Sequence, residues 1–153
     1  MESDLEVGDR NSLCGLIYTI RDFADTEYQQ RVWVRGEGPE VSGLVEALSE
    51  LDRIDEFAGP IGARYGLPLN AITALREFAA KIKAFDAGIT SYYESSDEEI
   101  IAKEGWKGVV DTAAHALDAT LPWFEDNCRE YPTFRFTWRG KEYGGGSPRG
   151  PSE

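Results

Sequence analysis

Residues 70–85 read NAITALREFAAKIKAF, and this segment decides the fold class that we predict. Its large apolar residues recur every three or four positions, which places them on one face of a helix: Ile72, Leu75, Phe78, Ala79, Ile82 and Phe85. Asn70 can cap the start, because its side chain accepts a hydrogen bond from a free backbone N–H. Gly88 can end the helix. The segment predicts an amphipathic helix whose apolar face other elements must cover.

Apolar residues at the same spacing predict further helices. One is expected to begin near Asn11 or Ser12, either of which can cap it. Within residues 95–99, each of two serines precedes a glutamate by three positions, which is the pattern of a capping box. Pro122 is expected to limit the last helix, since proline breaks a helix interior. The expected helices cover residues 11–24, 41–57, 96–104 and 106–121.

The C-terminal part changes character after the last predicted helix. Residues 134–138 alternate apolar and polar side chains, and a short turn at 139–140 separates them from residues 141–143. This pattern predicts a small β-hairpin. Two strands alone are marginally stable in water, so the hairpin is expected to lay its aromatic face on the helices or on a partner.

The predicted fold class is therefore mainly all-α. We expect one domain over residues 11–143, a bundle of about five helices that ends in the short C-terminal β-hairpin. Residues 1–10 are expected to be a flexible N-terminus. The glycine- and proline-rich residues 144–153 are expected to be a disordered tail, because they offer almost nothing to bury.

Charge excludes some classes of partner. The chain has 28 acidic and 16 basic residues, a formal net charge of −12. Nucleic acids and anionic membrane surfaces are disfavoured, because binding them depends on Lys and Arg meeting phosphates. A basic protein is the partner that such a field attracts. The alternative is that the charge only maintains solubility.

The chain carries no recognisable targeting signal. Its first residues lack the basic and apolar regions of a secretory signal, and no apolar run approaches the ~20 residues of a membrane span. Cys14 and Cys128 are far apart and fit no ligand-spaced cluster, so we expect reduced thiols. The expected compartment is the cytoplasm.

No pattern in the sequence predicts catalysis, a metal site or a cofactor. His115 is the one histidine, and a triad would need two further residues to converge on it. The cysteines match no zinc pattern, and the acidic residues lack the spacing of a calcium loop. We therefore expect no catalytic residue, no metal and no cofactor.

Carboxylates gather on two of the predicted helices and form the predicted partner-binding surface. One group lies on the outer face of the 41–57 helix and the other near residues 94–99. Like charges cost a helix only a few tenths of a kcal/mol per pair, so a solvated face is the alternative interpretation. The predicted contact residues are Asp52, Asp55, Glu56, Asp97, Glu98 and Glu99.

Residues 20–36 contain the pattern Ala-Asp-x-x-Tyr-Gln-x-Arg-Val-Trp. This segment resembles small acidic bacterial proteins of the contact-dependent growth inhibition immunity type, and the similarity extends more weakly to about Leu121. The resemblance implies a protein that binds and neutralises a toxin domain, without catalysis or a cofactor. Such proteins often carry Phe/Tyr-Asp-Asp after the second helix, where this chain has Ile54-Asp55-Glu56-Phe57. The predicted contact residues therefore come from the charge pattern.

The first functional hypothesis is an immunity-type protein that covers the active site of a cognate basic toxin, such as a nuclease whose phosphate-binding residues its carboxylates would meet. Two alternatives belong to other classes. An enzyme with an acidic cleft would need a deep pocket holding His115 and a carboxylate. A helical adaptor or a homodimer would need a self-complementary apolar face.

Overall fold

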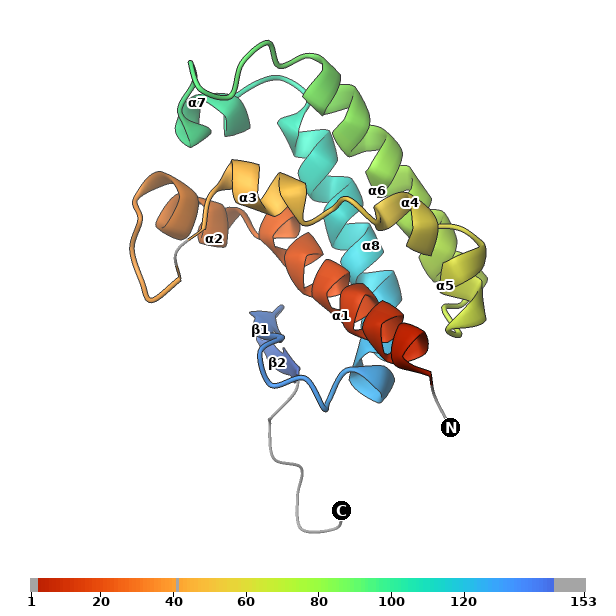
Figure 1. Ribbon diagram of the computed structural model, residues 1–153. Coiled ribbons are helices and arrows are strands. Elements are labelled where there is room, and N and C mark those ends of the chain that lie inside the picture. The colour runs from red at the N-terminus through yellow and green to blue at the C-terminus, as the bar shows by residue number, and fades with distance from the viewer. Residues whose placement is uncertain (1–2, 41, 145–153) are drawn as a thin grey trace.

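Three long helices form the body of the protein. The computed structural model describes residues 3–40 and 42–144. Helix α8 (Trp106–Asn127) packs against both α1 (Asp4–Ala24) and α6 (Leu69–Ala87), as Figure 1 shows. The buried stripe predicted for α6 is confirmed except at Phe85, which is partly buried. The prediction that Asn70 caps this helix is wrong, because the helix begins at Leu69 and Pro68, two residues before Asn70, occupies the N-cap position.

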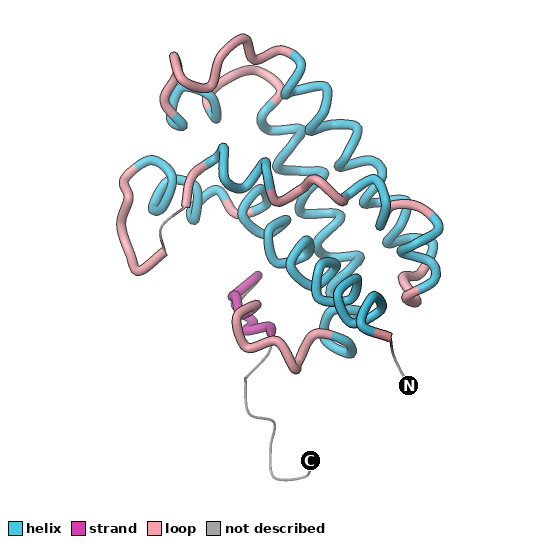
Figure 2. Tube along the Cα trace, in the orientation of Figure 1, coloured by secondary structure: helices cyan, strands magenta, loops and turns pink. Residues whose placement is uncertain are grey.

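Shorter elements surround this body, and the predicted hairpin is present (Figure 2). The short helices are α2 (Thr26–Tyr28), the π-helix η1 (Gln29–Val34), α3 (Leu44–Ser49), α4 (Ile54–Phe57), α5 (Pro60–Arg64) and α7 (Asp97–Ile101). The antiparallel strands are β1 (Arg135–Trp138) and β2 (Lys141–Gly144). The mainly helical fold class with a C-terminal hairpin is therefore confirmed.

Helix α1 begins earlier than the sequence pattern predicts. Ser3 and Glu6 form a capping box, in which the Ser3 Oγ accepts from the Glu6 N–H at 3.1 Å and Glu6 accepts from the Ser3 N–H at 3.2 Å. The predicted start near Asn11 and the flexible segment over residues 1–10 are wrong for residues 4–10, which are helical. The first turns carry few apolar residues, so hydrophobic periodicity could not detect them.

The single helix predicted over residues 41–57 is wrong. The chain instead forms α3 and α4, joined by a tight turn in which the Ile54 N–H donates to the Leu51 carbonyl at 3.0 Å. Leu48, Leu51, Ile54 and Phe57 are spaced by three residues, which fits turns closed by i to i+3 hydrogen bonds better than an α-helix of 3.6 residues per turn. Val41 lies outside the described residues.

Pro122 does not stop α8, which continues to Asn127. Proline removes one backbone hydrogen bond, but its ring is exposed here. Trp123 and Phe124, directly after it, are buried and hold the last turns against the core. Tertiary packing therefore outweighs the local cost of the proline.

Cys14 and Cys128 form a disulfide, so the prediction of two reduced thiols is wrong. Both side chains are fully buried, and their Cα atoms lie 5.8 Å apart although 114 positions separate them in the sequence. The packing of α1 against α8 brings them together. The bond ties the C-terminal end of α8 to the middle of α1.

Gln29 explains part of the motif in residues 20–36. Its side chain is 1% exposed, and its Nε2 donates to the carbonyls of Asp22 (2.9 Å) and Phe23 (3.0 Å). Its Oε1 accepts from the Trp106 indole Nε1 at 3.0 Å. Tyr28, one residue earlier, packs in the core. Gln29 thus joins the end of α1 to the start of α8.

Replacing Gln29 by Met is expected to lower the free energy of unfolding by about 1–3 kcal/mol, because a buried indole N–H and two carbonyls lose their partner. Urea unfolding followed by circular dichroism measures this. The exposed neighbour Gln30→Met is the matched control and should change stability by under about 0.5 kcal/mol. Equal midpoints for the two variants would contradict the role of Gln29.

The hairpin packs on the helices, which is one of the two arrangements predicted for it. Phe136 and Trp138 on β1 are buried, and the Trp138 Nε1 donates to Asp118 on α8 at 2.8 Å. Of the predicted disordered tail, Gly144 belongs to β2 and residues 145–153 lie outside the described residues. No helix within the described part of the chain is long and apolar enough to cross a membrane.

Candidate functional site

The six predicted contact residues lie in two groups at opposite ends of α3. Asp52, Asp55 and Glu56 lie at the turn before α4 and on α4 itself, whereas Asp97, Glu98 and Glu99 form the first turn of α7 (Figure 1). The structure therefore does not bring all six into one cluster. Each group has its own set of contacts.

Most of the α7 group has a structural role. The Asp97 carboxylate accepts a hydrogen bond from the Leu44 N–H at 3.1 Å and so caps the start of α3, which has no cap from its own preceding residue. Glu99 closes a capping box with Ser96, and these backbone and side-chain hydrogen bonds lower the pKa of Glu99. Only the Glu98 side chain in this group makes no hydrogen bond or ion pair with the described residues.

Two of the three carboxylates in the α4 group are paired. Glu56 accepts two hydrogen bonds from Arg53, both at 3.1 Å, and Arg53 also reaches the buried Asp9 at 2.9 Å. Asp55 forms an ion pair with Lys83 on α6. Asp52 is exposed, and among the described residues nothing pairs with it. It is the carboxylate here most available to a partner.

A groove of about 230 Å³ lies between this group and α6. Its apolar floor consists of Leu48, Leu51, Ile54 and Ile82. Its rim carries three carboxylates and one cation, which are Asp52, Asp55, Asp86 and Lys83. We call this concavity the acidic groove. An apolar floor beneath a negative rim fits the long stem and charged end of a lysine or arginine side chain.

Sequence reasoning missed Lys83 and Asp86. They lie on the exposed side of α6, beside the buried Ile82, and Asp86 accepts a hydrogen bond from the Tyr92 hydroxyl. Burial and this carboxylate raise the pKa of Tyr92. The available signal was the interruption of the apolar stripe of α6 by an acidic residue four positions after Ile82.

His115 lies on the exposed side of α8. The carboxylate that interacts electrostatically with His115 is Asp118. Asp118 already accepts hydrogen bonds from the Trp138 indole and from the Arg139 Nη2, the latter at 2.9 Å. Over residues 3–40 and 42–144, no three His, Cys, Asp or Glu side chains converge so that they could hold a metal ion.

A second, larger cavity of about 620 Å³ lies away from the acidic groove, between the end of α1, the η1 segment and the hairpin. It is lined by aromatic side chains, by four arginines and by the carboxylates of Asp25, Glu27 and Glu40, so its lining carries one more cation than anions, whereas the groove has an excess of carboxylates. Sequence reasoning did not identify it, because its residues come from segments more than 90 positions apart.

No protein-family model, curated protein sequence or solved structure gives a significant match to this chain. The resemblance of residues 20–36 to immunity proteins therefore stays a prediction.

Proposed function

We propose that this chain is a non-catalytic binding protein that inhibits a basic bacterial toxin domain by covering its active site. The acidic groove is the observation that supports the proposal. It combines three rim carboxylates with one lysine over an apolar floor, in a protein whose net charge is −12. Interface hot spots combine a pocket and a charged anchor in this way.

The groove would receive one basic side chain of the partner. The aliphatic stem of a lysine or arginine would lie on Leu51 and Ile54, and its charged end would reach Asp52 and Asp86. Apolar contact contributes about 25 cal/mol per Å² of buried surface, while the carboxylates select for a cation. A nuclease active site, which uses Lys and Arg to bind phosphate, would supply such side chains.

The two groups of carboxylates would act at different ranges. Those in the groove would contact the partner directly, whereas Glu98 and the other exposed acidic residues would steer its approach through the long-range field. Asp97 and Glu99 hold α3 and α7 in place, so we assign them a supporting role.

The proposed compartment is the cytoplasm, where the protein would meet an incoming toxin. The buried Cys14–Cys128 disulfide bears on this location, because disulfides are rare in cytoplasmic proteins and form in oxidising compartments. Cell fractionation with an immunoblot of each fraction measures where the protein lies. Recovery of the protein outside the cytoplasmic fraction would contradict the proposed location.

Reversing the charge of Asp52 is expected to weaken binding of the toxin at least tenfold. The probe is the protein encoded by the neighbouring gene, which on this proposal is the toxin, and calorimetry measures its dissociation constant for the wild type and for Asp52→Lys. Asp126→Lys is the matched control, since Asp126 is also exposed but lies on α8, away from the groove. It should weaken binding less than twofold.

The salt dependence of association gives an independent readout. The wild-type association rate constant should fall steeply between 0.01 and 0.1 M salt, because the Debye length shortens from about 30 Å to about 10 Å. Stopped-flow measurements decide this. If the rate is indifferent to salt and equal in both charge-reversal variants, the acidic groove is not the contact surface.

A further inference from the structure

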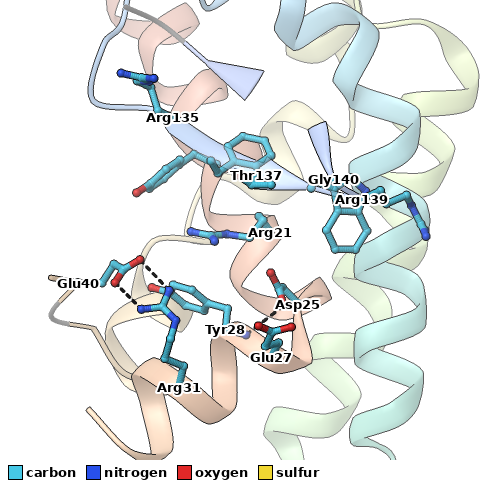
Figure 3. Close-up of a pocket in the computed structure, with 13 residues that line it drawn as sticks. Arg21, Asp25, Glu27, Tyr28, Arg31, Glu40, Arg135, Thr137, Arg139 and Gly140 are labelled. Carbon is cyan, nitrogen blue, oxygen red and sulfur yellow. Dashed lines mark hydrogen bonds and ion pairs between the residues drawn. The ribbon is translucent and has the colours of Figure 1, made fainter. Parts of the chain in front are cut away.

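The larger cavity has the size of a small-molecule site. Its volume of about 620 Å³ falls within the roughly 300–1,000 Å³ typical of ligand pockets. Figure 3 shows Arg21 between Tyr28 on one side and the hairpin residue Thr137 on the other. We call it the arginine cavity. The residues that carry the argument are Tyr18, Arg21, Tyr28, Arg31, Phe136 and Arg139.

Arg21 is the buried cation of this cavity. It is 8% exposed, and its guanidinium carbon lies 4.2 Å from the ring centroid of Tyr28. The rings of Tyr18 and Phe136 each lie 5.9 Å away. Aromatic faces stabilise a guanidinium but accept none of its in-plane hydrogen bonds well. The edge of the guanidinium therefore still needs an acceptor.

The protein does not provide that acceptor fully. The Arg21 Nε lies 3.3 Å from the Asp22 carboxylate, but the two atoms are not aligned as a hydrogen bond and both are buried without one. Neither Nη atom donates a hydrogen bond to any residue in the described part of the chain. The buried Nε is thus left without a hydrogen bond, which is costly, and the Nη atoms of this cavity-lining arginine are free to donate to an external acceptor.

The three other arginines of the cavity are already paired, and Arg135 forms its ion pair with Glu142. Arg31 donates two hydrogen bonds to Glu40, at 2.8 and 2.9 Å, and this pairing lowers the pKa of Glu40 to about 2. Arg139 donates to Asp118 at 2.9 and 3.2 Å. These pairs line the cavity with fixed polar groups, whereas Arg21 alone combines burial with free donors.

We propose that the arginine cavity binds a small organic anion whose carboxylate or phosphate oxygens accept hydrogen bonds from the Nη atoms of Arg21. A guanidinium binds such planar or trigonal oxyanions through two parallel hydrogen bonds. The organic part of the ligand would pack against Tyr18 and Phe136. This site is separate from the acidic groove and does not depend on the proposed inhibition of a toxin.

Phenyl phosphate and benzoate are suitable probes, because each joins an oxyanion to an apolar ring. Calorimetry with the full chain is expected to detect binding of at least one of them, and the more tightly bound probe identifies the oxyanion class. Arg21→Met should weaken that binding at least tenfold. Arg129→Met is the matched control, because Arg129 is exposed and does not line the cavity. It should change the dissociation constant of the probe less than twofold.

A second variant keeps the test decisive if Arg21→Met folds poorly. Thr137 is exposed at the cavity wall, so Thr137→Trp would fill the space without removing any contact of Arg21. It should weaken probe binding at least tenfold with an unchanged thermal midpoint. Failure of the wild type to bind either probe at 10 mM (about 2.7 kcal/mol of affinity), or equal binding by the Thr137→Trp variant, would overturn the proposal.

Discussion

Removing the disulfide, by Cys14→Ala together with Cys128→Ala, is expected to lower the free energy of unfolding by about 2–5 kcal/mol. The bond joins positions 114 residues apart, so it restricts most of the unfolded chain. In the chain-entropy account, a loop of that length gains among the largest stabilisations. The double variant should therefore unfold at a clearly lower urea concentration than the oxidised wild type.

The wild type in excess reductant is the natural comparison. Once unfolded and refolded with reductant present, it should share the midpoint of the double variant, because both lack the cross-link. Reductant should leave the midpoint of the double variant unchanged. If the oxidised wild type and the double variant unfold together, the bond adds nothing to stability, and α1 and α8 are held by packing alone.

Local signals in the sequence predicted the elements whose stability is local. The 3.6-residue period of α6, the capping serine before α7 and the alternation in β1 each depend on neighbours within a few residues. The start of α1 and the break between α3 and α4 also had local signals, the Ser3-x-x-Glu6 capping pattern and the three-residue spacing from Leu48 to Phe57, but hydrophobic periodicity alone did not use them. The passage of α8 through Pro122 was wrongly predicted because a propensity yields when packing opposes it.

The candidate sites were predicted less completely than the fold. Charge alone identified Asp52 and Asp55 as exposed carboxylates, but it could not separate them from Asp97, whose carboxylate caps a helix 53 positions away. The arginine cavity had one sequence signal. Arg21 follows Leu13 and Ile17 at intervals of four, so it continues the buried stripe of α1 where a charge is unexpected.

Asp22 is a buried acidic residue whose pKa is raised. It is 7% exposed, and burial raises its pKa to about 7, although the neighbouring Arg21 opposes this. Glu50 and Asp25 add to the increase through repulsion. A buried carboxylate with a poorly aligned counter-ion gains less from ionisation than the same group does in water. Asp22 therefore makes the stability of the fold depend on pH.

The sign of that dependence follows from proton binding. In the unfolded chain Asp22 has its ordinary pKa of 3.8, so it loses its proton as the pH rises above about 4. In the folded protein it keeps the proton up to about pH 7. The folded state thus binds more protons between these values, and its stability falls as the pH rises through that window. One pKa unit corresponds to about 1.4 kcal/mol. The difference between the folded pKa of about 7 and the unfolded pKa of 3.8 therefore limits the loss of stability to about 4 kcal/mol.

Replacing Asp22 by Asn is expected to remove this loss, because the amide has nearly the same shape and never ionises. The variant should match the wild type at pH 4 and exceed its free energy of unfolding by up to about 4 kcal/mol at pH 8. Urea unfolding at pH values from 4 to 8 measures the difference between the two curves.

Glu40 and Asp9, whose pKa values are lowered, give stability that is lost only as the pH falls below about 4.5. Both proteins carry these residues, so subtracting the wild-type curve from the variant curve cancels their contribution. Asp126→Asn is the control, since Asp126 is exposed on α8 and is not one of the charged groups that act on Asp22. Its curve should run parallel to that of the wild type. Parallel curves for Asp22→Asn as well would mean that Asp22 is ionised in the folded protein throughout, with Arg21 as an adequate partner.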